Sequence, residues 1–128
     1  HPRYRPFGDM LKETYARYER PLFVAETGIE DEARPSWFRY VCKQVRLALR
    51  AGTQIEGVCL YPIVNHPGWV DDRHCHNGLW DYPDELGNRE AYEPLKREIE
   101  RQQGYFKTLL DPTKEEVGPR YAEELMQT

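Results

Sequence analysis

Two short apolar runs, separated by a segment of helical periodicity, constrain the fold of this chain more than any other feature. Residues 22–25 (Leu-Phe-Val-Ala) form the first run, and residues 55–60, with Ile55, Val58, Cys59 and Leu60, form the second. Short apolar runs bounded by Gly and Pro are typical of strands in parallel sheets, which are covered on both faces. Because such strands alternate here with helical segments, we expect an α/β fold with a parallel sheet.

Three segments have helical periodicity. The first spans about residues 9–19 with Asp9 as its N-cap, the second begins at Pro35 and stops at Gly52, and the third spans about residues 91–110. We expect Arg46 of the second helix on its solvent face. Apolar residues follow neither a helical nor a strand periodicity from residue 63 to residue 88. Loops longer than about 12–15 residues are usually functional or disordered, and the two Trp and three His of this one disfavour disorder.

Two strands are too few for a stable parallel sheet, since each strand needs neighbours and a cover on both faces. The chain has 128 residues and opens at His1 with a Pro- and Arg-rich stretch. We therefore expect residues 1–111 to be the C-terminal part of a larger domain whose other strands lie upstream. Residues 112–128 are expected to form a charged tail.

Composition excludes several classes of function. The chain has 18 Lys and Arg against 22 Asp and Glu, and this acidic excess argues against a nucleic-acid partner, which would need a basic face. No run approaches the ~20 apolar residues of a membrane span, so no membrane partner is expected. Three cysteines are too few for a disulfide scaffold, which favours a reducing compartment and a cytoplasmic location.

Glu26 stands where the first predicted strand meets its loop, and a second polar and aromatic cluster follows the second strand. In parallel α/β proteins, ligands bind at the carboxyl ends of strands. Aromatic rings stack on the apolar faces of sugars, while indole, amide and phenol groups bind hydroxyls. A carbohydrate site is one interpretation. In the alternative one, Glu26 is a solvated residue of an acidic loop and the aromatic residues close the end of a core. The cluster contains Tyr61, Asn65, His66 and Trp69.

These segments resemble motifs of family 1 glycoside hydrolases. Residues 22–28 (Leu-Phe-Val-Ala-Glu-Thr-Gly) are similar to the seventh-strand motif, typically Ile-Thr-Glu-Asn-Gly. Residues 57–69 (Gly-Val-Cys-Leu-Tyr-Pro-Ile-Val-Asn-His-Pro-Gly-Trp) resemble the eighth-strand motif, typically Gly-Tyr-Phe-Ala-Trp-Ser-Leu-Leu-Asp-Asn-Phe-Glu-Trp. Residues 77–82 (Asn-Gly-Leu-Trp-Asp-Tyr) resemble the later Phe-Gly-Leu-Tyr-Tyr-Val-Asp. The resemblance implies the last two strand–helix units of a (β/α)8 TIM barrel, the C-terminal part of a β-glucosidase-like enzyme.

The resemblance also implies roles for individual residues. Glu26 falls on the catalytic nucleophile, Tyr61 on the aromatic floor of the sugar site, and Trp69 on a Trp that binds a sugar hydroxyl. Gly68 stands where the family has a Glu that grips sugar hydroxyls, and Asn65 replaces an Asp.

The resemblance further implies a retaining double-displacement mechanism on a carbohydrate, without a cofactor. The second carboxylate of the family, the general acid/base, belongs to an upstream strand, and nothing in this chain matches it. The fragment alone is therefore expected to be inactive. Tyr61-Pro62 replaces a Trp-Ser pair whose peptide bond is cis, and an X-Pro bond could keep that geometry.

Two alternatives stay open at this point. The Gly at position 68 and the Tyr at position 61 would suit a non-catalytic carbohydrate- or partner-binding barrel. Residues 71–76 (Asp-Asp-Arg-His-Cys-His) hold zinc-ligand types and could build a metal-dependent hydrolase, but their spacing matches no zinc motif, so no metal is predicted. We expect Arg73 instead to bind an anionic group of an unusual sugar. Cys42 and Cys59 are expected to be buried.

Overall fold

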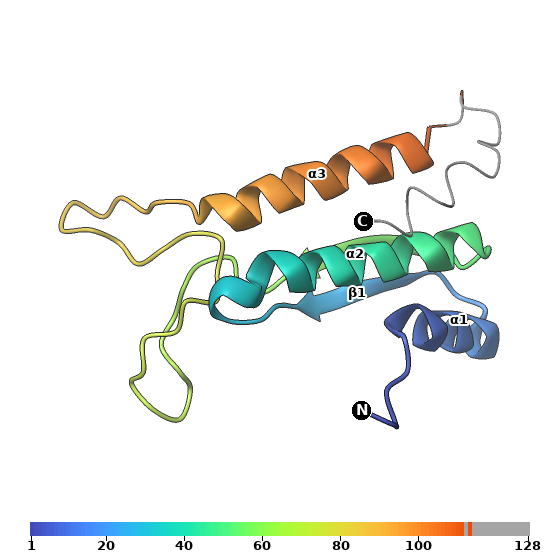
Figure 1. Ribbon diagram of the computed structural model, residues 1–128, viewed down its shortest axis with the longest axis horizontal. Helices are drawn as coiled ribbons and strands as arrows, with labels where there is room; N and C mark the ends of the chain where they lie inside the picture. The colour runs from blue at the N-terminus through green and yellow to red at the C-terminus, as the bar shows by residue number, and fades with distance from the viewer. Residues whose placement is uncertain (112, 114–128) are drawn as a thin grey trace.

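The computed structural model describes residues 1–111 and 113. Helices and strands alternate along the chain as predicted, and a 3-10 turn lies where the sequence indicated only a loop (Figure 1). The predicted tail falls outside the described residues except at Thr113. In order, the elements are α1 (Phe7–Tyr18), β1 (Leu22–Thr27), the 3-10 turn (Asp31–Ala33), α2 (Arg34–Arg50), β2 (Ile55–Leu60) and α3 (Glu93–Leu109).

The strands β1 and β2 pair in parallel, which confirms the predicted sheet. Leu22 lies opposite Ile55, and Thr27 lies opposite Leu60, with two register shifts between these pairs. Both strands therefore end at the same edge of the sheet, which we call the strand-end rim. The long loop after β2 projects from this rim, beyond the point of the β1 arrow (Figure 1).

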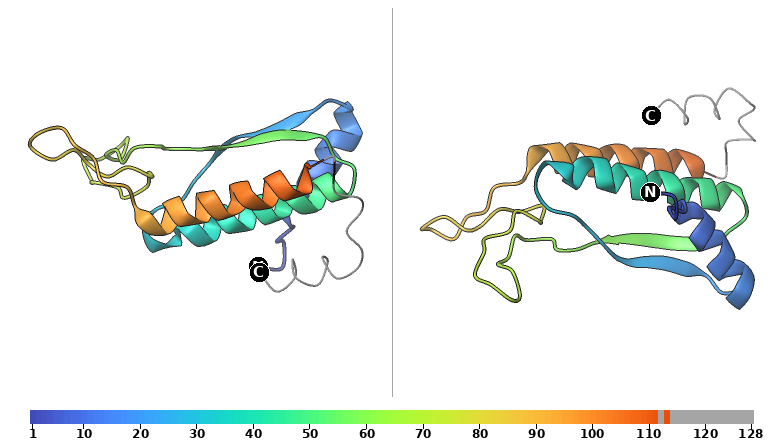
Figure 2. Two further views of the ribbon diagram at one scale, coloured as in Figure 1. Left: turned by 90° about the horizontal axis from the view of Figure 1, so that it is seen from above. Right: turned by 60° about the horizontal axis from the view of Figure 1, so that its bottom comes forward.

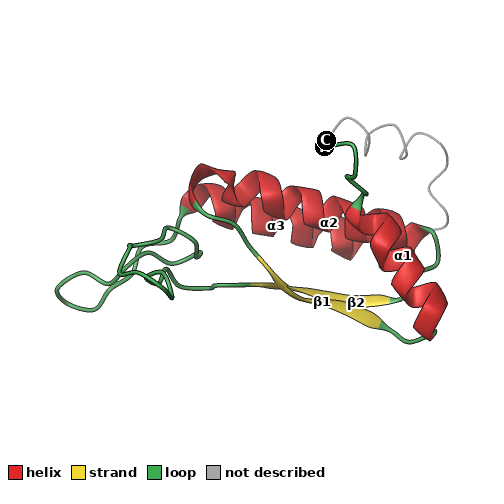
Figure 3. Ribbon diagram, turned by 90° about the horizontal axis from the view of Figure 1, so that it is seen from below, coloured by secondary structure: helices red, strands yellow, loops and turns green. Residues whose placement is uncertain are grey.

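One face of the sheet is covered by the helices. In Figure 3, α2 and α3 lie side by side on one side of the strands, and α1 packs against α2 and runs at an angle toward the start of β1. Two groups of buried side chains join this helix layer to the sheet, one around α1, β1 and α2, and the other between α2 and α3. The first group is Leu11, Val24, Val41, Val45 and Ala48. The second group is Phe38, Cys42 and Leu95.

The other face of the sheet is bare among the described residues. The Phe23 side chain is 58% exposed, and Ala25 and Cys59 are also exposed. Figure 2 shows no described element on this side of the strands. The second cover that such strands need is therefore not supplied by the described chain, in line with the expected larger domain, whereas the predicted burial of Cys59 is wrong. The reason is that α1, α2 and α3 all pack on the same face.

The start of α1 differs from the prediction. The helix begins at Phe7, and Asp9 pairs with Lys12 (2.8 Å) instead of capping the helix. The backbone N–H groups of Phe7 and Gly8 donate to side chains of α2, the Tyr40 hydroxyl (3.1 Å) and Gln44 Oε1 (3.0 Å). Because a neighbouring helix supplies the acceptors that a cap residue would provide, α1 can start two residues earlier.

Arg46 is buried, so its prediction as a solvent-facing residue is wrong. Its side chain is 3% exposed, lies over the Tyr105 ring (4.9 Å to the centroid) and donates to Gln102. The cause is α3, which packs on this face of α2. The sequence of α2 carries no information on where a helix more than 40 residues later will land.

A buried carboxylate also joins α2 to α3. Glu98 is 2% exposed and accepts hydrogen bonds from Arg39 (2.9 Å), Arg101 (3.0 Å) and Gln102 (2.6 Å). Burial opposes ionisation, but the bonds from Arg39 and Gln102 and the two guanidinium charges outweigh it, so the pKa of Glu98 lies below its usual value. The helix layer is therefore held by apolar packing and by one satisfied ion cluster.

Candidate functional site

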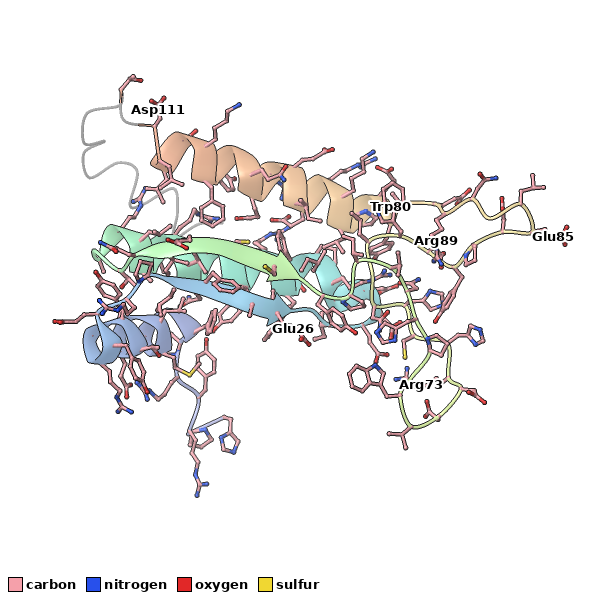
Figure 4. All side chains as sticks on the ribbon, turned by 180° about the vertical axis from the view of Figure 1, so that it is seen from behind. Glu26, Arg73, Trp80, Glu85, Arg89 and Asp111 are labelled. Atoms are coloured by element: carbon pink, nitrogen blue, oxygen red, sulfur yellow. The ribbon has the colours of Figure 1, made fainter. Side chains whose placement is uncertain are left out.

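Glu26 lies at the strand-end rim, as the next-to-last residue of β1, so the strand continues one residue beyond the predicted end. Its side chain is exposed, and it stands on the ribbon close to the loops that leave the sheet (Figure 4). No hydrogen bond or ion pair joins its carboxylate to another residue in ranges 1–111 and 113. A carboxylate at this place is open to a ligand from the loop side.

Tyr61 is held beside the segment that follows Glu26. The Tyr61 backbone N–H donates to the Thr27 carbonyl (3.0 Å). A Cβ at Gly28 would lie 2.0 Å from the Tyr61 carbonyl oxygen, so this close approach of the two chains requires glycine. The Tyr61–Pro62 peptide bond is cis, as predicted. The phenol ring is 42% exposed and therefore available to a ligand at the rim.

The His66 ring packs near the Tyr61 ring, with 5.9 Å between centroids. His66 Nδ1 lies 2.7 Å from the Pro67 carbonyl oxygen. Because a carbonyl can only accept, Nδ1 carries the hydrogen, and in the neutral ring Nε2 is an acceptor. Nε2 is buried and has no hydrogen-bond partner among the described residues. Glu26, Tyr61 and His66 thus all belong to the strand-end rim.

Asn65 is used to hold the loop together. It is 4% exposed, and its Oδ1 accepts from the backbone N–H groups of Asn77 (3.0 Å) and Gly78 (2.6 Å). Its Nδ2 donates to Asp81 Oδ1 (2.9 Å). Asn65 therefore fixes the start of the loop against its middle, and a direct contact with a sugar stays a prediction.

Asp81 was not singled out from the sequence, although it lies within one of the resembling motifs. Its Oδ1 also accepts the Tyr82 backbone N–H (2.7 Å). This bond holds the pKa of Asp81 below its usual value, together with the hydrogen bond from Asn65 and the attraction of nearby positive charges. A polar cavity of about 310 Å³ lies here, lined in part by Arg34, Asn65, His76 and Asp81.

Trp69 and Arg73 lie on a hairpin-like excursion of the same loop. Trp69 is 85% exposed, and within the described residues no ring contact or hydrogen bond links it to Tyr61 or Glu26. The Arg73 guanidinium donates two hydrogen bonds to Glu30 (2.7 and 3.0 Å). The structure brings Arg73 to the loop after β1, a link that nothing in the sequence indicated. Contacts of either residue with substrate stay predictions.

Other candidate sites receive no support from the described residues. Within ranges 1–111 and 113, no three His, Cys, Asp or Glu side chains converge as a metal site would require. An apolar cavity of about 390 Å³ between α2, β2 and α3 contains none of the predicted site residues. No helix in the described part of the chain has the length and apolarity to cross a membrane.

Comparison with known proteins gives matches in structure only. No protein-family model and no curated protein matches the chain. The β-glycosidase of Thermosphaera aggregans matches with a TM-score of 0.64 and 20% identity, over 78% of this chain and 22% of that one. A β-glucosidase from Exiguobacterium marinum matches with a TM-score of 0.63 and 18% identity, over 77% of this chain and 25% of that one. A family 1 β-glucosidase from Thermotoga maritima, solved with isofagomine lactam, matches with a TM-score of 0.59 and 14% identity, over 72% and 24%.

The chain has the fold of part of a β-glucosidase. The predicted α/β class and partial TIM barrel are thereby confirmed. The chain spans about a quarter or less of the length of these structures. The bare sheet face and the open strand edges are what a piece of a closed barrel exposes when seen by itself.

Proposed function

We propose that this chain is the C-terminal portion of a retaining β-glycosidase and that Glu26 is its nucleophile. One observation carries the proposal: the parallel pairing of β1 with β2 brings Glu26 and Tyr61 to the same end of the sheet. In TIM barrels, catalytic residues come from the carboxyl ends of several strands. A solvent-open carboxylate beside an exposed phenol, in the fold of part of a β-glucosidase, supports a site for a carbohydrate.

The chemistry assigned to Glu26 is attack on a sugar. An ionised Glu26 oxygen would bond to the anomeric carbon as the bond from that carbon to the leaving oxygen breaks. A second carboxyl group, about 5–5.5 Å away, would give its proton to the leaving oxygen. It would then take a proton from water, whose oxygen displaces Glu26 and frees the sugar. This second group would come from the rest of the barrel, so the chain alone is inactive on this proposal, and no cofactor takes part.

The sugar would be held by the side chains of the loop after β2. We assign the Tyr61 ring to the floor of the site, and His66 and Trp69 to contacts with hydroxyl groups. Asn65 acts by fixing the loop through Asp81 and the backbone of Gly78. The three cysteines are all free thiols, which suits a reducing compartment such as the cytoplasm.

The proposal is tested by replacing Glu26 in the complete polypeptide that carries this chain. Glu26→Gln should lower kcat for an aryl β-glucoside by roughly 10⁴-fold, because no covalent intermediate can form. Azide should restore turnover to Glu26→Gly, since a small anion can enter the space left by the carboxylate. The matched control is Glu32→Gln, which removes an exposed carboxylate of the 3-10 turn that follows β1. Retention of normal kcat in Glu26→Gln would refute the proposal.

A non-catalytic carbohydrate-binding barrel is the second candidate, and Gly68 favours it. Gly68 lacks the acidic side chain that the resembling family carries there, and Asp71 Oδ1 lies 2.4 Å from where a Cβ would stand, so the Asp71 side chain would have to move to admit one. A polypeptide of this kind would bind a β-glucoside in a calorimetric titration and leave it intact. Turnover that depends on Glu26 excludes this candidate.

A further inference from the structure

The loops that follow β1 and β2 are tied together by one ion pair at their outer ends. Arg73 Nη1 donates to Glu30 Oε2 (2.7 Å), and Nη2 donates to Oε1 (3.0 Å). Two parallel bonds between a guanidinium and one carboxylate give geometric precision that single-bond pairs lack. Hydrogen bonding from Arg73 lowers the pKa of Glu30, and the same bond raises the pKa of Arg73, so both groups are charged at neutral pH.

Arg73 ends a compact hairpin over residues 67–74. Pro67 and His74 form an antiparallel bridge, and the Gly68 backbone N–H donates to the Arg73 carbonyl (2.9 Å). Asp71 Oδ1 accepts the Arg73 backbone N–H (3.2 Å) and occupies the space beside Gly68. Trp69 and Val70, 85% and 101% exposed, lie at the turn of this hairpin and are not held by packing.

The base of the hairpin is attached separately. The Asp31 backbone N–H donates to the His76 carbonyl (2.8 Å), and the buried Arg34 donates through Nη1 to the Gly78 carbonyl (2.7 Å). These bonds fix the chain after residue 75 and leave the turn itself unattached. The Glu30–Arg73 pair is the side-chain link that joins the hairpin to the loop of the proposed nucleophile, and Figure 4 shows Arg73 on this outlying part of the loop.

We infer that Glu30 and Arg73 are positioning residues, which set the place of Trp69 relative to Glu26 and thereby the affinity for the sugar. This inference rests on the proposed function. On this inference Arg73 acts through the hairpin and does not bind the sugar itself, because both terminal nitrogens of its guanidinium already donate to one carboxylate. Neither residue touches the reacting atoms, so the pair acts on substrate binding and not on the chemical step.

The test compares Arg73→Gln, Glu30→Gln and the charge swap Glu30→Arg/Arg73→Glu in the complete polypeptide. Each single variant should raise KM for 4-nitrophenyl β-glucoside roughly two- to fivefold, the range of a well-formed exposed pair, with kcat nearly unchanged. Hydrogen exchange of the peptide 67–74, followed by mass spectrometry, should become faster. The charge swap should restore both KM and the hydrogen-exchange rate of the peptide 67–74. Asp72→Asn, which changes an exposed residue of the same hairpin, is the matched control and should change neither KM nor the exchange rate.

Two results would overturn the inference while leaving the glycosidase proposal intact. In the first, Arg73→Gln raises KM, hydrogen exchange of the hairpin is unchanged and the swap gives no rescue, which is the behaviour of a direct contact with substrate. In the second, the exchange accelerates but KM stays as it was, so the hairpin has no part in sugar binding. Absence of turnover in the unchanged polypeptide would instead defeat the proposed function, and this inference with it.

Discussion

The two faces of the small sheet differ in how completely the chain satisfies them. On the helix side, apolar side chains are buried, and Glu98 has three hydrogen-bond donors. On the other side, Phe23 and Cys59 are exposed, and at the strand-end rim Tyr61 is exposed and Glu26 stands without a partner in the described chain. The helix side therefore satisfies most of its buried groups within the described chain, whereas the bare face and the rim leave theirs exposed. Glu26 and Tyr61, the residues that carry the proposed function, belong to this exposed rim.

Thiol chemistry gives the largest expected contrast between the two faces. Cys42 is 1% exposed, and burial raises its pKa to about 12 from the ordinary 9.0, so its thiolate fraction falls about a thousandfold. Cys59 lies exposed on the bare face. In the isolated chain, a disulfide reagent at pH 8 should therefore modify Cys59 about a thousandfold faster than Cys42, as measured by peptide mass spectrometry. Equal rates would mean that the helix layer opens readily or that the bare face is covered.

Truncation of one apolar side chain on each face should give the next largest contrast. Leu95 is 1% exposed, so Leu95→Ala should lower the free energy of unfolding by about 3 kcal/mol through lost burial and a new cavity. Phe23 is 58% exposed, so Phe23→Ala in the same chain should cost less than about 0.5 kcal/mol. Urea unfolding followed by circular dichroism measures both. If Phe23→Ala costs as much as Leu95→Ala, the bare face is buried in solution against a further surface.

The ion cluster at Glu98 should contribute less to the free energy of unfolding than the Leu95 side chain does. Glu98→Gln removes the charge that Arg39 and Arg101 share and should cost about 2 kcal/mol at pH 7. Glu100→Gln, an exposed change on the same helix, is the control and should cost almost nothing. A loss at Glu98 no larger than that at Glu100 would show that the cluster does not hold the helices together.

The same cluster predicts a pH dependence with a definite sign. The pKa of Glu98 is lowered in the folded state. Its contribution to the free energy of unfolding is therefore complete above the pKa of the unfolded chain, near 4.5. It is lost as the pH falls through the lower folded value. The difference in stability between the unchanged chain and Glu98→Gln should therefore shrink between pH 5 and pH 3. A difference that grows on acidification would contradict the assigned partners.

Local sequence patterns predicted the elements well and their tertiary surroundings poorly. The apolar runs and helical periods located β1, β2 and α2 because those patterns report which residues can be buried together. The rim position of Glu26 and Tyr61 followed as well, since parallel strands end at one edge. Burial of Arg46, capping of α1 by Tyr40 and the Glu30–Arg73 pair depend on elements far apart in the chain, and no local pattern encodes them.

The role of Glu26 as nucleophile is tested most directly by covalent trapping. A 2-deoxy-2-fluoro glucoside with a good leaving group forms the glycosyl-enzyme quickly and releases it slowly, so the label accumulates on the attacking residue. In the complete polypeptide, mass spectrometry of a protease digest should find the fluorosugar on Glu26 and should find none in Glu26→Gln. Labelling of a different carboxylate, or the same label in Glu26→Gln, would contradict the account.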